Sequence, residues 1–181
     1  MGNMDRKNRS AQLRKLTVCA MLAALGVVLL YLGSMIEVAD LSMAVLASLL
    51  CVFAVIEYGG SAPWLVFAVT GVLSLILIPQ KTPAVFYLLF FGYYPIVKEK
   101  LEKMPRGVSW VLKEVIFNIA LALVLLLSRF LLMASSATPW LLYVAFAMLA
   151  ELIFPLYDIA MTRLITLYLR RYRARVSRLM N

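Results

Sequence analysis

The stretch Leu16–Ile36, LTVCAMLAALGVVLLYLGSMI, carries no charged residue and is long enough to cross a membrane as a single helix. A helix of about 20 residues spans roughly 30 Å, the thickness of the hydrocarbon core of a bilayer. Five further apolar segments follow, at about 41–57, 62–79, 84–97, 109–132 and 139–169. We therefore expect an all-α, polytopic membrane protein, a compact bundle of about six transmembrane helices in residues 16–169.

The composition supports a membrane protein and excludes much familiar chemistry. Of the 181 residues, 64% are hydrophobic and only 15% are charged, and the mean hydropathy is +0.93. The absence of histidine removes imidazole metal sites and histidine-dependent nucleophiles. Cys19 and Cys51 lie within apolar segments, where they resemble small apolar residues. We expect neither an enzyme nor a metal or cofactor site.

The basic residues predict the topology. If the N-terminus is cytoplasmic, 16 of the 18 Lys and Arg residues flank the inner ends of the segments, as positively charged loops do. Residues 1–15 then form a basic cytoplasmic N-terminal segment and residues 170–181 a basic cytoplasmic tail, both suited to anionic lipids and not to nucleic acid. The run KEKLEK, residues 98–103, has the mixed charges of a solvated helix end.

The stretch AELIFPLYDIAMTR, residues 150–163, places two carboxylates inside the last apolar segment. Glu151 is about twelve residues after Pro139, or about 18 Å into the membrane, and Pro155 leaves its carbonyl without the usual helical donor. Intramembrane ionisable groups are functional candidates, so Glu151 could bind a solute, form a structural hydrogen bond with Asn118, or carry a proton. Asp158 suits a pairing with a cation at the inner surface.

A second group of candidates gathers at the predicted outer ends of the segments. Aromatic walls with a few charged groups are typical of small-molecule sites, whereas Trp and Tyr at this depth also form the interfacial belt of ordinary membrane proteins. The candidates are Glu37, Asp40, Tyr87, Arg129, Trp140 and Tyr143.

Small residues in the first segment suggest a helix-docking face. Ala20 and Ala24 are four residues apart, with Ala23 beside them and Gly26 following. In lipid, small residues let a second helix approach closely, and this packing drives association. The second helix could belong to the same chain or to a partner.

Together these features resemble the substrate-binding S component of energy-coupling factor transporters: a basic N-terminus, Ala20-x-x-x-Ala24, six segments in about 180 residues and a basic C-terminus. The resemblance implies a bacterial plasma membrane protein that binds a vitamin-like micronutrient from outside. It also implies docking, through Ala20 and Ala24, onto a transmembrane coupling subunit with two cytosolic ATPases. Glu37 and Asp40 would lie in the loop that covers the solute.

Other classes of protein are also consistent with these features. A scaffold of the cell-shape machinery, similar to the rod-shape protein MreD, would also be a small multispan protein without enzymatic motifs. A small proton-coupled carrier could use Glu151 and Asp158, and a lipid-handling enzyme is the least supported because no nucleophile, base and orienting group converge.

Overall fold

The computed structural model describes residues 2–131 and 140–171, and every regular element within them is helical. The chain falls into two compact units, one up to Val124 and one from Leu125 onward. The elements are α1 Gly2–Met35, the 3₁₀ turn η1 Glu37–Ala39, α2 Asp40–Glu57, α3 Ala62–Leu77, α4 Thr82–Phe86, the π-helical turn η2 Tyr87–Phe91, α5 Tyr94–Leu101, α6 Arg106–Leu131 and α7 Trp140–Arg171.

Four helical stretches in the described residues are long and apolar enough to cross a membrane. The predicted all-helical membrane fold is therefore confirmed, although six spans are not established. The stretches are Arg9–Met35, Asp40–Glu57, Arg106–Leu127 and Val144–Arg170. The third predicted segment, α3, has only 16 residues, about 24 Å of helix against a hydrocarbon core of about 30 Å.

The fourth predicted segment, 84–97, is not one helix but a chain of short pieces, α4, η2 and α5. Pro83 and Pro95 each stand in the first turn of a piece, where the missing N–H is harmless. Between them, the Gly92 amide donates to the Tyr87 carbonyl at 2.6 Å, a five-residue step that widens the helix into a π turn. The prolines and the π turn thus replace a spanning helix with a bent segment.

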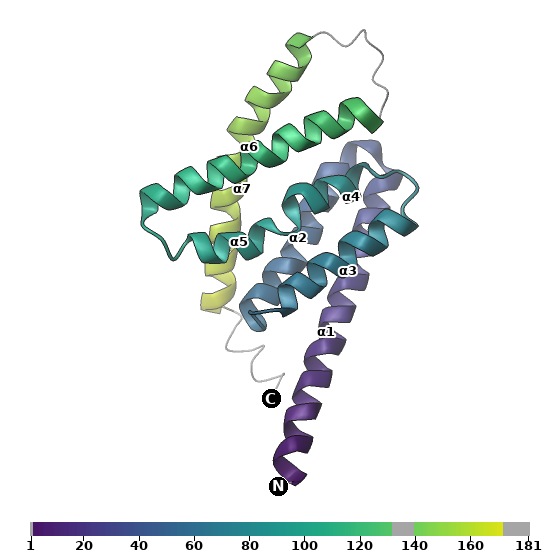
Figure 1. Ribbon diagram of the computed structural model, residues 1–181, viewed down its shortest axis with the longest axis vertical. Coiled ribbons are helices and arrows are strands. Elements are labelled where there is room, and N and C mark those ends of the chain that lie inside the picture. Colours follow the sequence, from purple (N-terminus) through teal and green to yellow (C-terminus); the bar gives the residue numbers. More distant parts are fainter. Residues whose placement is uncertain (1, 132–139, 172–181) are drawn as a thin grey trace. The chain divides into compact units, whose positions relative to one another are not determined.

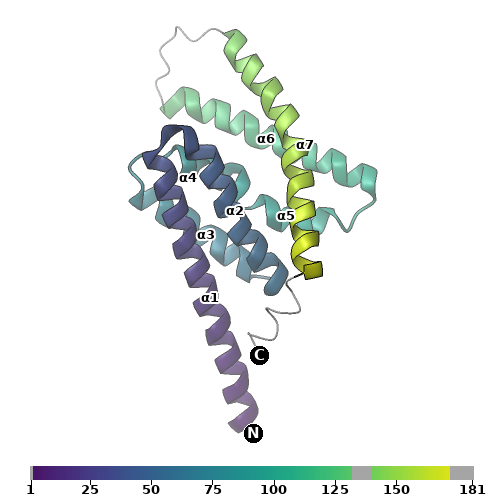
Figure 2. The ribbon, with the colours of Figure 1, turned by 180° about the vertical axis from the view of Figure 1, so that it is seen from behind.

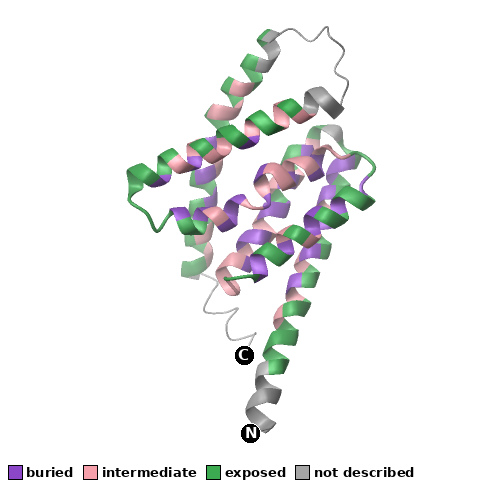
Figure 3. Ribbon diagram, in the orientation of Figure 1, coloured by how far each residue is buried: buried purple, intermediate pink, exposed green. Residues whose placement is uncertain are grey.

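The first unit is built around α1, which lies beside α2 and α3 (Figures 1 and 2). Helix α1 buries one face and exposes the other, as the alternating colours along it show (Figure 3). Its buried face follows the helical repeat through Cys19, Ala23, Val27 and Leu30. The helix begins before the predicted apolar segment, so the basic residues preceding Leu16 prolong it.

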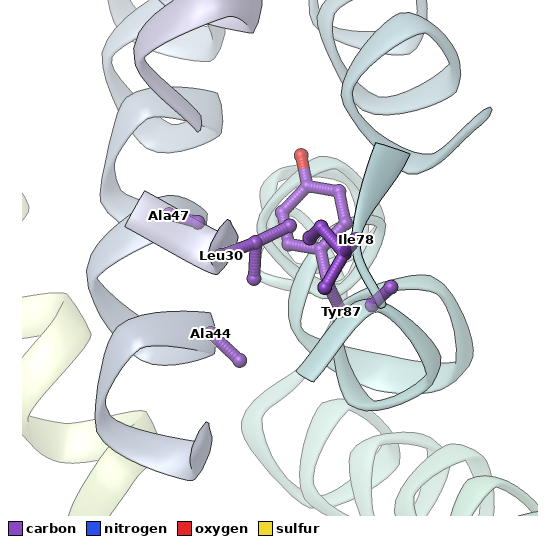
Figure 4. Close-up of a cluster of buried hydrophobic side chains, with 6 residues drawn as sticks. Leu30, Ala44, Ala47, Ile78 and Tyr87 are labelled. Atoms are coloured by element: carbon purple, nitrogen blue, oxygen red, sulfur yellow. The ribbon is translucent and has the colours of Figure 1, made fainter. Parts of the chain in front are cut away.

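A central apolar cluster joins α1, α2 and the bent segment. Leu30 of α1, Ala44 and Ala47 of α2, Ile78 and Tyr87 are each at most 1% exposed and pack together (Figure 4). The alanines keep α2 close to the other members of the cluster, since a side chain of one carbon fills little space. This cluster is the core against which the candidate site is placed.

The second unit consists of the last turns of α6 and the 32-residue helix α7, which continues through Pro155. Thr162 and Thr166 each donate their hydroxyl to the carbonyl four residues earlier, at 2.9 and 2.8 Å. Such bonds satisfy a hydroxyl inside its own helix.

Candidate functional site

Three buried hydroxyl groups, those of Thr70, Ser74 and Tyr87, form what we call the hydroxyl cluster. Their residues are 1%, 0% and 0% exposed. Thr70 lies close to the Tyr87 hydroxyl, and Ile78 packs against Tyr87 within the apolar core. Ser74 stands one helical turn from each of Thr70 and Ile78, on the same face of the chain. Ser74 is therefore buried on the α3 face that also carries Thr70.

Two members of the hydroxyl cluster lack a hydrogen-bond partner. Thr70 Oγ1 donates to the Ala23 carbonyl of α1 at 3.4 Å, which links α1 to α3. In the described part of the chain, neither Ser74 Oγ nor Tyr87 Oη meets hydrogen-bond geometry with any protein atom, Thr70 included. A buried hydroxyl without a partner costs about 1–3 kcal/mol.

Two other buried serines in apolar helices have hydrogen-bond partners within their own helix. Ser34 Oγ donates to the Tyr31 carbonyl at 2.7 Å, and Ser48 Oγ donates to the Val45 carbonyl at 2.7 Å. Both use the preceding turn of their own helix, the usual solution for a serine in an apolar helix. Ser74 does not adopt this solution, so its hydroxyl stays available.

Glycines bring the helices together around the hydroxyl cluster. A Cβ on Gly26 of α1 would lie 2.9 Å from the Thr70 methyl carbon, and a Cβ on Gly71 of α3 would overlap the Leu88 side chain. A Cβ on Gly92 would lie 2.5 Å from a ring carbon of Phe67 and 2.8 Å from a ring carbon of Tyr87. Only glycine leaves room for these approaches, so the placement of the cluster depends on them.

Aromatic rings border the hydroxyl cluster on one side. Phe67 of α3 lies 6.0 Å from the Tyr87 ring and 6.2 Å from Tyr93, centroid to centroid, and Trp64 lies 6.1 Å from Phe67. These separations are typical of aromatic pairs that attract one another. Uncharged hydroxyls beside aromatic rings are a combination found in small-molecule sites.

The structure describes the side chains of only some of the candidates predicted at the outer ends of the segments. Tyr87 is buried in the core, and Asp40 is 7% exposed at the start of α2, one turn before Ala44 of the same core. The side chains of Glu37, Arg129, Trp140 and Tyr143 lie outside the described residues. Sequence reasoning therefore selected Tyr87 but missed Ser74 and Thr70, whose four-residue spacing in an apolar helix was the available signal.

The two carboxylates of the last predicted segment lie on one face of α7, as their seven-residue spacing predicts. Glu151 is half-buried and Asp158 is 3% exposed. Asn118 is exposed on α6 and donates its Nδ2 to the Glu114 carbonyl at 3.1 Å. The hydrogen bond between Glu151 and Asn118 stays a prediction, as do the solute and proton roles of Glu151.

The three alanines of the predicted docking face lie on two different sides of α1. Ala20 and Ala24 are exposed, whereas Ala23 is 1% exposed and offers its carbonyl to Thr70. Ala23 thus packs within the chain and is out of reach of a partner helix. Of the predicted docking residues only Ala20 and Ala24 are exposed, and their docking role stays a prediction.

The charged run at residues 98–103 differs from the prediction of a solvated helix end. Lys98 is 1% exposed, and its Nζ lies 2.9 Å from Glu102. Lys113 of α6 is also buried, lies 3.5 Å from the same carboxylate and stands over the Trp110 ring at 5.7 Å. Burial of the lysine stems against neighbouring helices explains the difference, since a charge pattern does not report tertiary contacts.

Comparisons with known proteins do not place the chain in a family. No family model matches it, and no curated protein or solved structure matches it significantly. Within the described residues, no three His, Cys, Asp or Glu side chains gather in a way that could hold a metal ion.

Proposed function

We propose that the chain is the solute-binding membrane component of a bacterial importer, similar to the S component of energy-coupling factor transporters. In this proposal it lies in the plasma membrane with both termini in the cytoplasm and takes up a vitamin-like micronutrient from outside. A transmembrane coupling subunit, powered by two cytosolic ATPases, receives the loaded component.

The observation that carries the proposal is the division of α1 into two faces of small residues. Ala23 and Gly26 pack inward against the first unit, whereas Ala20 and Ala24 are exposed. Within lipid, an exposed alanine gains nothing over leucine from contact with acyl chains, but it allows a partner helix to approach closely. The outward face suits a partner helix that binds without disturbing the inward packing.

Co-purification tests this proposal directly. Ala20→Leu and Ala24→Leu add bulk to the exposed face and should reduce the retained coupling subunit and ATPases at least tenfold, while solute binding is unchanged. Ala122→Leu, at an exposed alanine of α6, is the matched control. Intact co-purification of both α1 variants would remove the docking hypothesis.

Native mass spectrometry of the gently purified protein separates the proposal from its alternatives. A retained micronutrient together with a membrane subunit and ATPases supports the importer. Cell-shape or cell-wall proteins without a small molecule would instead favour the scaffold. Neither outcome depends on knowing the solute beforehand.

A further inference from the structure

We propose that Ser74 and Tyr87 form the recognition point for an uncharged, ring-bearing solute that presents a hydroxyl or amide edge. This inference rests on the proposed importer function and names the chemical class of its cargo. It is carried by two observations, the unpartnered hydroxyls and the aromatic rings beside them.

The two hydroxyls indicate which polar groups a bound solute would present. Ser74 Oγ and Tyr87 Oη are fully buried, and neither has a hydrogen-bond partner in the described chain. Native proteins seldom leave such groups unsatisfied, and those that remain call for an explanation such as a ligand or a water. Each hydroxyl can both donate and accept, which matches the paired donor and acceptor of an amide or the single group of an alcohol.

The two elements that carry these hydroxyls, α3 and the π turn, favour a neutral bound group. Helix α3, Ala62–Leu77, contains no Asp, Glu, Lys or Arg, and the π turn Tyr87–Phe91 contains none either. Lys81, the basic residue that follows α3, donates to the carbonyls of Leu75 and Ile78 at 2.6 and 2.5 Å. A buried ion without a countercharge is costly, so the site favours an uncharged group.

The aromatic side chains indicate a flat molecule. Phe67 stands next to the Tyr87 ring, and Trp64 and Tyr93 stand next to Phe67. Ring stacking or edge contacts add stabilisation beyond buried area. A planar ring whose polar edge meets Ser74 and Tyr87 would use both features together.

Tyr87 stands where the helix widens into the π turn. The π turn inserts an extra residue into the helical turn, and such turns are frequent at functional sites because they redirect side chains away from the regular helical register. Tyr87 is the first residue of η2 and accepts the closing hydrogen bond from Gly92. Gly92 in turn approaches Phe67, so the turn brings the hydroxyl and the ring into the same region.

The test uses a defined equimolar mixture of charged and uncharged water-soluble vitamins as the probe. The purified full-length protein is incubated with the mixture and desalted, and the retained compounds are quantified by mass spectrometry. Tyr87→Phe and Ser74→Ala remove one hydroxyl each with little change in shape. Ser34→Ala is the matched control, because the Ser34 hydroxyl is already satisfied within α1.

We expect an uncharged ring compound to be retained by the wild-type protein. Each test variant should weaken its binding about threefold to tenfold, the loss of one uncharged hydrogen bond. Ser34→Ala should leave the affinity unchanged, and the solute-free melting temperature of both test variants should be equal to or above that of the wild type.

Three results would overturn the inference. Retention of a charged compound would contradict the neutral site. Unchanged affinity in both variants would show that the hydroxyls serve only core packing or an internal water, while the importer function stands. Retention of nothing by the wild-type protein would refute the importer function itself, and this inference with it, so the two failures are distinguishable.

Discussion

Replacement of Gly33 by alanine should weaken the junction of α1 and α2. Gly33 is buried near the end of α1, and a Cβ there would lie 2.9 Å from the Cβ of Met43 and 3.7 Å from the Cα of Asp40. The first of these atoms is attached directly to the backbone of α2. Because the Cβ of Met43 cannot move by a change of rotamer, the two helices must separate.

The magnitude follows from two opposing effects. Overpacking of a close contact costs about 1–3 kcal/mol, whereas alanine is favoured over glycine inside a helix by about 1 kcal/mol. Gly33→Ala should therefore lower the free energy of unfolding by up to about 2 kcal/mol. Gly107→Ala, in the first turn of α6 with no atom within 4 Å of the new Cβ, keeps only the helical gain.

Equilibrium unfolding in mixed micelles, with increasing dodecyl sulfate fraction, measures both variants against the wild-type protein. The difference between Gly33→Ala and Gly107→Ala isolates the overpacking, since the gain in helix propensity is common to both. We expect this difference to be about 1–3 kcal/mol. Equal stability of the two variants would refute the close approach of α1 and α2 at Gly33.

Two further predictions concern the turns that connect the helices. Lys81→Met should remove the donors to the Leu75 and Ile78 carbonyls and destabilise the end of α3 by about 1.5–3 kcal/mol, and faster amide exchange in residues 75–78 than in the wild type would reveal it. Burial raises the pKa of Tyr58, which follows α2, so its contribution to stability should be present below pH about 10 and be lost as the pH rises through the folded-state pKa. Ultraviolet titration of wild type and Tyr58→Phe would check this, and an ordinary tyrosine pKa would contradict it.

The helices were predictable from the sequence because membrane insertion imposes a local requirement. A run of apolar residues must satisfy its backbone internally, and α2, α6 and α7 accordingly begin and end near the predicted segments. The early start of α1 was missed because apolar residues mark only the part of a helix that lies in a membrane. Charged residues such as Arg9 and Lys15 also favour a helix and extend it beyond that part. The π turn of the bent segment was missed because it depends on the packing around it.

The candidate site was less predictable because it is marked by buried hydroxyls without a hydrogen-bond partner, a property that the composition does not show. Ser74 resembles Ser34 and Ser48 in sequence, since each stands in an apolar helix. Only the structure shows that Ser34 and Ser48 bond to the preceding turn whereas Ser74 does not. Tyr87 was selected as an aromatic at the membrane boundary, and its burial beside Phe67 required the fold.

The two faces of α1 suggest how one helix can serve both folding and association. Inside the first unit, Gly26 allows close contact with Thr70, and the Thr70 hydroxyl adds a bond to the Ala23 carbonyl. A partner helix at Ala20 and Ala24 would use the same packing of small residues, but from the exposed side. Changes on the inner face should therefore alter stability and association together. Changes on the outer face should alter association alone, which makes the docking role separable from the fold.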